Sequence, residues 1–401
     1  MEMQKTKISH VISGTLLIAG TTIGAGMLGI PLLTAGSGFL PAVIVTLAVW
    51  IFMVATGFLF LEAILWMPDG ANILSLANRF LGKKGKFLAG ITFAFLYYCL
   101  LVAYYAAGAP ILNSFLEALT GVSLVGWKGF AFYGLLFGVI VSFGIKWIDR
   151  LNYVLMAGLV ISYIFLISGG ASQVEAGRLE YQNWPKVFYA APVLFSAFGY
   201  HNVIPSLTHY FHRNVKVLRF AIFWGTFIPL IVYLIWQWLI IGGLPKSVVA
   251  EALQRGQPVT EALQEMAGAP WIQGMGRAFG FFAIVTSLLG VAFSMVDFLG
   301  DGLNKKRTGR DRIYLCLLTF FPPFIFSALD PSIFLTALSI AGGFGEAFLN
   351  GILPVGLVWA GRYYHGLRGR YPLPGGRLSL TALFGTAFLV MLLEILFLAT
   401  Q

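Results

Sequence analysis

Charged side chains are scarce in this chain: only 10% of its 401 residues are Asp, Glu, Lys or Arg, whereas 58% are hydrophobic. A chain so poor in charge cannot cover itself with the polar surface that a water-soluble domain presents. Apolar runs of about 18 or more residues recur along its whole length, and a run of that length can cross a bilayer as a helix. The scarcity of charge excludes a soluble domain of any size and predicts a polytopic helical protein embedded in lipid.

Cysteine is equally scarce, because Cys99 and Cys316 are the only two, and both fall inside apolar segments. Isolated thiols of this kind are usually small packing residues, so we expect neither a disulfide nor a metal site. The sequence also lacks a phosphate-binding loop, a cluster of metal-ligating side chains and a nucleophile beside a base. These absences argue against an enzyme and predict that the protein has no cofactor.

Hydropathy predicts about eleven membrane-spanning helices within one domain that covers residues 1–401. The expected spans are 8–35, 39–66, 86–110, 127–145, 147–169, 187–208, 216–241, 273–300, 312–328, 332–361 and 379–399. Loops between them are short, and only the longest, 242–272, together with residues 71–81, is a candidate for surface helices. The first span lacks a cleavage site followed by polar sequence, so we expect it to be retained.

The net charge of +10 comes from basic residues in short loops, which makes it a topology signal rather than a sign of nucleic-acid binding. If the N-terminus is cytoplasmic, six of the 26 Lys and Arg residues face the other side. Those six are Lys128, Arg178, Lys186, Lys246, Arg255 and Arg277. This asymmetry predicts a cytoplasmic N-terminus and a periplasmic C-terminus.

The first span contains an unusual stretch, Gly-Thr-Thr-Ile-Gly-Ala-Gly-Met-Leu-Gly-Ile-Pro at 20–31. Glycine costs roughly 1 kcal/mol relative to alanine inside a helix, so the stretch predicts a broken helix that lines a polar cavity. A broken helix presents N–H groups to an anion at one end and carbonyl groups to a cation at the other, which suits a zwitterion such as an amino acid. The alternative is close helix packing through small residues at Gly20, Gly24, Ala25 and Gly29.

The sixth span carries a second interruption, Phe-Ser-Ala-Phe-Gly-Tyr-His-Asn-Val-Ile-Pro-Ser at 195–206. Each interruption places a glycine six or seven residues before a proline, Gly24 before Pro31 and Gly199 before Pro205. Interrupted segments at corresponding positions of two halves indicate the binding site of a secondary transporter. We therefore expect an inverted repeat with halves at about 8–169 and 187–361, and an extra helix at about 379–399.

Few ionisable groups lie within the predicted spans, and each is a functional candidate by default. Glu62 and Asp297 are near span ends, where headgroup solvation is an equal alternative. Glu346 is in mid-span and is expected to face the bundle. His201 lies in the second interruption and is either a packed neutral imidazole or a proton carrier. Glu394 lies outside the repeat, and we expect it to be peripheral.

Span eight carries the hydroxyls of Thr286 and Ser287, which either bond back to their own helix or help to ligate a cation. Span three is rich in tyrosine, and Tyr97 and Tyr98 are near its middle. Tyrosines at that depth favour an aromatic-lined cavity for an aromatic or large apolar ligand over an interfacial belt.

Four stretches match a known family in order and spacing over nearly the full chain. Residues 19–28 read Ala-Gly-Thr-Thr-Ile-Gly-Ala-Gly-Met-Leu, and 198–206 contain Phe-Gly-Tyr-His and Val-Ile-Pro-Ser. Residues 289–299 read Leu-Gly-Val-Ala-Phe-Ser-Met-Val-Asp-Phe-Leu, and 319–323 read Thr-Phe-Phe-Pro-Pro. The chain resembles the bacterial aromatic amino acid permeases, and their tyrosine-specific members most of all. The resemblance implies the LeuT-like fold of the amino acid–polyamine–organocation superfamily, with helices 1 and 6 broken.

The resemblance also implies roles for named residues. Backbone N–H groups of the first break would hold the substrate carboxylate, carbonyl groups of both breaks would hold its ammonium, and aromatic rings would flank its side chain. The implied substrate-binding residues are Ala19, Thr21, Thr22, Gly24, Ala25, Gly26, Tyr97, Tyr98, Phe195, Ser196, Phe198, Gly199 and Tyr200. The implied sodium site of the superfamily corresponds to Gly20, Ile23, Thr286 and Ser287. The candidate proton carriers are His201, Glu346 and Asp297.

One feature departs from proton-coupled relatives, which often carry a lysine in span five: here no Lys or Arg occurs between Arg150 and Arg178. The prediction is a secondary active transporter of the bacterial inner membrane that imports aromatic L-amino acids, tyrosine first, by proton symport and alternating access. The alternatives are a sodium-coupled symporter for aromatic or neutral amino acids, an exchanger, or an uncoupled channel or sensor. We expect no nucleic-acid partner and no obligate protein partner.

Overall fold

The computed structural model describes residues 8–263, 270–369 and 372–399, and every regular element in these ranges is a helix. Lys5, Lys7 and Arg370, which the topology prediction counts as cytoplasmic, lie outside the described residues, as does Glu265 of the longest loop. The first half contains α1 (Ile8–Thr22), α2 (Gly26–Ala35), α3 (Phe39–Leu65), α4 (Ile73–Thr120), α5 (Trp127–Ser142), α6 (Ile145–Gly170), η1 (Ala171–Gln173) and α7 (Ala176–Leu179). The second half contains η2 (Trp184–Ala190), α8 (Ala191–Ala197), η3 (His201–Val203), α9 (Ile204–Tyr210), α10 (Val215–Gly243), α11 (Lys246–Gln254), α12 (Val259–Ala262), α13 (Pro270–Gly302), α14 (Gly309–Leu329), α15 (Phe334–Ile340), η5 (Ala341–Ile352), α16 (Leu353–Trp359), η6 (Ala360–Tyr364) and α17 (Gly376–Ala399).

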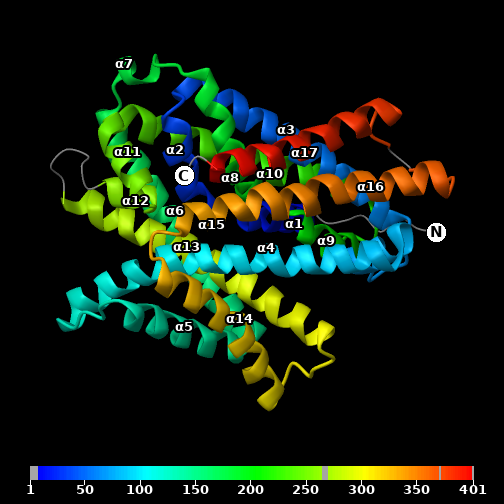
Figure 1. Cartoon of the computed structure of the whole chain (residues 1–401), viewed down its shortest axis with the longest axis horizontal. Coiled ribbons are helices and arrows are strands. Elements are labelled where there is room, and N and C mark those ends of the chain that lie inside the picture. The colour runs from blue at the N-terminus through cyan, green and yellow to red at the C-terminus, as the bar shows by residue number, and fades with distance from the viewer. Residues whose placement is uncertain (1–7, 264–269, 370–371, 400–401) are drawn as a thin grey trace.

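Each predicted span corresponds to a helical segment of this bundle (Figure 1). Within the described ranges, nine helices are long and apolar enough to cross a membrane, or ten if the bent pair α1 and α2 is one span. The remaining predicted span, 127–145, is α5, which has 16 residues and is shorter than the others. The loop expected to hold surface helices contains α11 and α12, and the candidate at 71–81 is the start of α4, which kinks at Gly82 (φ 70°).

Both predicted interruptions are breaks in the helices. The axes of α1 and α2 are bent by 55° at residues 23–25. In the sixth span, α8 ends at Ala197, and Phe198 and Tyr200 leave helical geometry before η3 and α9 resume the path. Pro205 lies at the start of α9, where its missing N–H does no harm, so the chain can restart a helix there. The two breaks therefore follow from local Gly and Pro chemistry.

The tenth span contains a feature that hydropathy does not reveal, because its middle, η5, is a π-helix. Glycines let other helices approach it closely. A Cβ atom on Gly342 would lie 2.7 Å from the carbonyl carbon of Pro192 in α8, and one on Gly345 would lie 2.8 Å from Cβ of Leu96 in α4. π-Helical turns within α-helices are often found at functional sites. Here η5 packs against α4, α8 and α17 at once.

Two carboxylates near span ends are more buried than their positions suggested. Glu62, for which headgroup solvation was an alternative, is 6% exposed and accepts two hydrogen bonds from Arg362, at 2.8 and 2.6 Å. Glu394, expected to be peripheral, is 0% exposed. That expectation was wrong because α17 packs on η5 through the face that carries Glu394, as the close approach of its Cβ to Gly343 shows.

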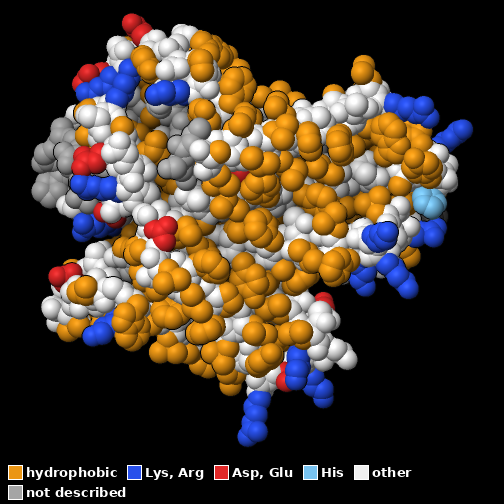
Figure 2. Space-filling model, viewed as in Figure 1, with side chains coloured by type: hydrophobic (Ala, Val, Ile, Leu, Met, Phe, Trp, Pro, Cys, Tyr) orange, Lys and Arg blue, Asp and Glu red, His pale blue; other side chains and the backbone are white. Residues whose placement is uncertain are grey.

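Hydrophobic side chains cover the middle of the face seen in Figure 2, and Lys and Arg gather at its ends. At the right-hand end they occur with few acidic neighbours, whereas at the left-hand end, near α7 and α11, both signs are mixed. This distribution fits an apolar belt in contact with lipid and one strongly basic end.

Candidate functional site

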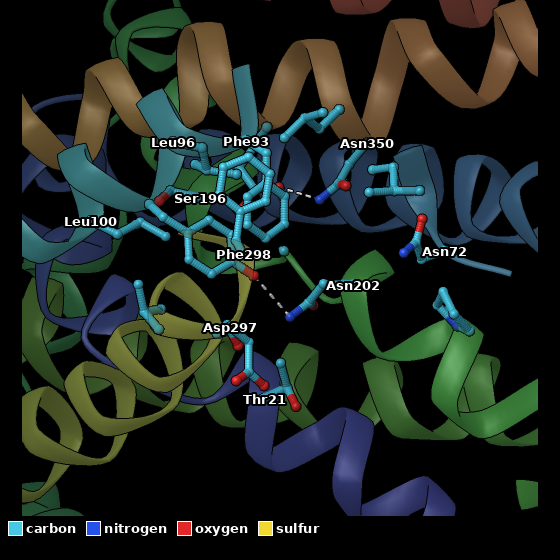
Figure 3. A pocket seen from close by; sticks show the side chains of 18 of the residues that line it. Thr21, Asn72, Phe93, Leu96, Leu100, Ser196, Asn202, Asp297, Phe298 and Asn350 are labelled. Atoms are coloured by element: carbon cyan, nitrogen blue, oxygen red, sulfur yellow. Dashed lines mark hydrogen bonds between the residues drawn. The ribbon is translucent and has the colours of Figure 1, made fainter. Parts of the chain in front are cut away.

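A cavity of about 960 Å³ opens beside the two helix breaks. Its inner part is lined by the first break, the end of α8, α4, α13 and η5, and its outer part by the start of α4 and the end of α13. The predicted residues in its lining are Thr21, Thr22, Gly24, Ala25, Gly26, Tyr97, Ser196, Gly199, Ser287, Asp297 and Glu346. Figure 3 shows its labelled side chains converging from different helices. The mouth includes Lys86 and Asp301, so the cavity opens toward the end of the bundle with the predicted cytoplasmic loops.

At Gly24 and Gly26 the first break lies so close to neighbouring helices that an added Cβ atom would collide. A Cβ atom on Gly24 would collide with the hydroxyl of Ser287, and one on Gly26 would lie 2.8 Å from Cα of Ala197. The N–H of Ala25 donates to Ser287 Oγ at 3.1 Å. The small residues thus serve both predicted purposes, because they allow close packing of α2 on α8 and expose backbone to the cavity.

The carbonyl ends of the two broken helices share one partner, Tyr233 of α10. Its hydroxyl lies 2.6 Å from the carbonyl oxygen of Thr22 and 2.9 Å from that of Ala197. One turn further along α10, Trp236 Nε1 donates to the carbonyl of Met27 at 3.1 Å. Sequence reasoning missed both residues, because an aromatic residue in an apolar helix gives no signal of its own.

One wall of the cavity is aromatic. The ring of Phe93 stacks on Tyr97 with centroids 4.1 Å apart, and on Phe298 at 4.7 Å. Asn202 Nδ2 donates to the hydroxyl of Tyr97 at 3.2 Å, which ties the second break to this wall (Figure 3). An apolar aromatic wall with a few polar groups is typical of a site for a small organic ligand. Tyr104, another tyrosine of span three, also lines the cavity.

A carboxyl group faces the cavity from η5. Glu346 is 5% exposed and accepts a hydrogen bond from Asn350, one π-helical turn away. A Cβ atom on Gly199 would lie 2.8 Å from the carboxyl carbon of Glu346, so the second break touches this group directly. Glu346 has no ion pair among the described residues, whereas Asp297 at the mouth pairs with Arg307 at 3.2 Å.

Several predicted residues lie outside the lining. His201 Nε2 is 3.1 Å from the hydroxyl of Thr56 on α3, and the ring is 1% exposed. The hydroxyl of Tyr98 donates to the carbonyl of Leu318 on α14 at 3.0 Å. Three further predicted aromatic residues, from α8 and the second break, also contact neighbouring helices. The ring of Phe195 packs on Phe52 and that of Phe198 on Tyr233. The hydroxyl of Tyr200 donates to the carbonyl of Met53.

The residues predicted to form a sodium site are only partly brought together. Thr286 bonds back to the carbonyls of Phe282 and Ala283, at 2.9 and 3.1 Å. The carbonyl of Ala19 accepts the N–H of Ile23 at 2.8 Å within the helix end. A Cβ atom on Gly20 would lie 3.5 Å from the terminal methyl of Met156, so α6 presents a thioether side chain to this part of α1.

Comparison with known proteins identifies the family. Residues 7–394 match the tryptophan/tyrosine permease family. The chain is 32% identical to tyrosine-specific transport system 1 of Haemophilus influenzae over 93% of both chains. It is 32% identical to tyrosine-specific transport system 2 of the same organism over 97% of both chains, and 30% identical to its tryptophan-specific transport protein over 85% of both.

The fold has a solved counterpart. The crystal structure of MhsT in complex with L-phenylalanine superposes with a TM-score of 0.64, covering 99% of both chains at 15% identity. This likeness shows the LeuT-like fold that the family resemblance implied. With the family match over nearly the whole chain and the all-helical bundle, it shows that the protein belongs to the tryptophan/tyrosine permease family, a family of multi-pass membrane transport proteins rather than enzymes.

Proposed function

We propose that this protein imports aromatic L-amino acids, with tyrosine as the first substrate, by proton symport and alternating access. The observation that carries the proposal is the cavity itself, in which both helix breaks, an aromatic wall and a carboxyl group with no ion pair among the described residues meet. The relatives named above are tyrosine-specific and tryptophan-specific transporters.

The zwitterionic part of the substrate would lie at the breaks. The N-terminal end of α2 at Gly24, Ala25 and Gly26 offers its helix dipole to the carboxylate. The carbonyl groups of Thr22 and Ala197, at the C-terminal ends of α1 and α8, would bind the ammonium next to the hydroxyl of Tyr233. The aromatic side chain would stack beside Phe93 and Tyr97. Alternating access would then open the same site to the other side.

Glu346 is the group that we assign to proton coupling. It faces the cavity, touches the second break through Gly199, and has no basic partner among the described side chains. A carboxyl group buried inside a membrane protein without a basic partner is more stable when it is neutral than when it is ionised. Because Glu346 touches the second break, its protonation affects the shape of the proposed substrate site, so binding of the proton and binding of the substrate are linked. His201 is less suited to the role because it packs on Thr56 away from the cavity.

We further propose that the protein lies in the bacterial inner membrane with its N-terminus in the cytoplasm and its C-terminus in the periplasm. The basic end of the bundle supports this orientation. The cavity would then be open to the cytoplasm, the state in which an importer releases its substrate.

Uptake of labelled tyrosine into proteoliposomes tests the proposal under a proton gradient alone and under a sodium gradient alone. Accumulation with protons alone supports it. Accumulation with sodium alone would replace it with the sodium-coupled alternative, to which Ser287 beside the first break would contribute a hydroxyl. Exchange of internal for external tyrosine without accumulation under either gradient would indicate an exchanger. Excess tryptophan, phenylalanine or leucine in each assay ranks the substrates.

A further inference from the structure

A second buried carboxyl group contacts η5 from α17, outside the cavity lining. Glu394 of α17 is 0% exposed, and its Oε2 lies 2.5 Å from the hydroxyl of Ser339 at the end of α15. Its other oxygen, Oε1, is buried and has no hydrogen-bond partner among the described residues. The rest of α17 presents apolar side chains to its surroundings, among them Phe388, Ile395 and Leu396.

No cation of the described residues compensates this group. The elements packed against α17 are η5, α8, η2 and α16. Their titratable side chains are Glu346 on η5 and Lys186 and Tyr189 on η2. The Lys186 chain reaches toward Gly36, and the Tyr189 ring packs on Phe397. Among the described residues, Glu394 therefore has no ion pair, and an ionised carboxylate there would have no compensation in a low-dielectric interior.

The contacts fit a neutral carboxylic acid. A protonated carboxyl group and the hydroxyl of Ser339 can satisfy each other with one hydrogen bond. A carboxylate would instead leave a buried, negatively charged Oε1 without a donor. The surroundings of Glu394 therefore favour the protonated acid over the carboxylate.

The place of Glu394 in the fold links that proton to the transport site. A Cβ atom on Gly343 would lie 3.0 Å from the carboxyl carbon of Glu394, so the acid lies directly on η5. Three residues further along η5, roughly 5 Å along the axis, Glu346 faces the cavity and the second break. One rigid segment thus carries a cavity-facing carboxyl and contacts a second one on α17.

Access differs for the two groups. Glu346 is reached through the cavity, whose mouth is at the end of α13 and the start of α4. Glu394 is five residues before the end of α17, about 8 Å along the axis, at the end of the bundle that carries η2. Figure 1 shows α17 running beside the α15–α16 segment toward that end. Glu346 is therefore open to the cavity, whereas Glu394 lies outside the cavity lining and nearer to the end of the bundle that carries η2.

We propose that Glu394 is a second proton-binding site of the transport cycle, loaded from the face opposite the cavity mouth. The proton is held while α17, Ser339 and η5 are packed as described, and it exchanges with solvent when η5 moves relative to α17. A neutral Glu394 favours the packed arrangement, and its ionisation favours separation, because the anion must regain water. This inference rests on the proposed proton-coupled function and adds a site that lies outside the substrate cavity.

The test separates net coupled transport from exchange in proteoliposomes. Counterflow of labelled against unlabelled tyrosine needs no net proton movement, whereas gradient-driven accumulation does. Glu394→Gln should leave counterflow within about twofold of the unmodified protein and reduce proton-driven accumulation at least tenfold. Glu394→Asp, which keeps an acid, should restore most of the accumulation with a shifted pH profile. Ser339→Ala should keep accumulation but shift that profile, because the acid remains and its hydrogen bond is lost.

An infrared titration provides a readout that does not depend on transport. The carbonyl stretch of protonated carboxyl groups should contain a component that titrates with pH and disappears in Glu394→Gln.

Equal proton-driven accumulation by the unmodified protein and Glu394→Gln, or an infrared component of Glu394 that does not change with pH, would overturn the inference. Absence of tyrosine counterflow in the unmodified protein would instead refute the proposed function. If Glu394→Gln fails to fold, the pH profiles of Glu394→Asp and Ser339→Ala decide, and unchanged profiles in both count against the site.

Discussion

The hydroxyl oxygen of Tyr233 lies 2.6 Å from the carbonyl oxygen of Thr22, at the point where α1 ends. The same hydroxyl lies 2.9 Å from the carbonyl of Ala197, where α8 ends. A single side chain on α10 thus joins the carbonyl ends of both broken helices. These are the groups to which we assign the substrate ammonium, so Tyr233 fixes the distance between the two halves of that site.

Tyr233→Phe should weaken tyrosine binding about two- to tenfold, because a net hydrogen bond contributes about 0.5–1.5 kcal/mol and here helps to preorganise two carbonyls. Equilibrium binding to purified protein measures the effect. The matched control is Tyr163→Phe, since Tyr163 also donates to a backbone carbonyl, that of Val232, at 2.9 Å. Equal weakening in the two variants would show that Tyr233 has no special role at the breaks.

Gly199→Ala should strongly reduce uptake, because a Cβ atom at this position would lie 2.8 Å from the carboxyl carbon of Glu346 and would displace that carboxyl group from its place beside the second break. Initial rates of tyrosine uptake in cells that express matched amounts of protein measure the loss. Gly290→Ala on α13 is the control, because a Cβ atom there meets nothing within 4 Å. Uptake near that of the unmodified protein in Gly199→Ala would contradict the contact between the break and the carboxyl.

Phe93→Ala should reduce affinity for tyrosine more than affinity for leucine. Phe93 is the middle ring of the Tyr97–Phe93–Phe298 stack, and aromatic pairs contribute about 0.5–1.5 kcal/mol beyond simple burial. Competition assays give the ratio of the two inhibition constants. Phe198→Ala is the informative comparison, because its ring packs against Tyr233. It should lower the amount of folded protein and change the ratio little, and the opposite pattern would return the selective role to Phe198.

The pair Glu62 and Arg362 should stabilise the fold only as a pair. Their side chains are 5% and 12% exposed, and removing one partner of a buried ion pair leaves an uncompensated charge that costs about 3–5 kcal/mol. Thermal unfolding in detergent should show a large loss for Glu62→Gln or Arg362→Gln and a smaller loss for the double variant. Glu251→Gln, which breaks the exposed pair with Arg255, should change stability by less than about 1 kcal/mol. Additive losses at Glu62 and Arg362 would argue against coupling.

The sequence was sufficient for features that depend on local chemistry. Gly24, Gly199 and Pro205 disrupt a helix wherever it packs, so both breaks could be predicted from them. Features that depend on which helices pack against each other could not be predicted from the sequence. In the sequence, Tyr233 cannot be distinguished from other aromatic residues of apolar helices. Its role follows only from the position of α10 against both breaks. Glu394 reads as peripheral until α17 is packed on the glycines of η5.

His201 shows that the sequence does not determine the direction in which a residue of a helix break points. Its position in the second break made it a candidate for proton transfer, but a break exposes some residues to the cavity and turns others toward the scaffold. The Nε2 atom of His201 is hydrogen-bonded to the hydroxyl of Thr56 on α3 at 3.1 Å, and Phe60 packs near the imidazole ring. The direction in which a non-helical residue points depends on its φ and ψ angles, which composition does not determine.

Glu346→Gln should remove most of the pH dependence of tyrosine binding, since the amide keeps the shape of the side chain and cannot exchange a proton. The carboxyl faces the cavity beside Gly199, and its only hydrogen bond among the described residues comes from Asn350. Binding measured at several pH values should vary in the unmodified protein and in Glu346→Asp, and should be nearly constant in Glu346→Gln. His201→Gln is the matched test of the rival carrier, and it should keep the pH dependence because its ring bonds to Thr56 outside the cavity. The reverse result would move the coupling proton from η5 to His201, and the second break, whose Gly199 and Asn202 line the cavity, would then connect substrate and proton.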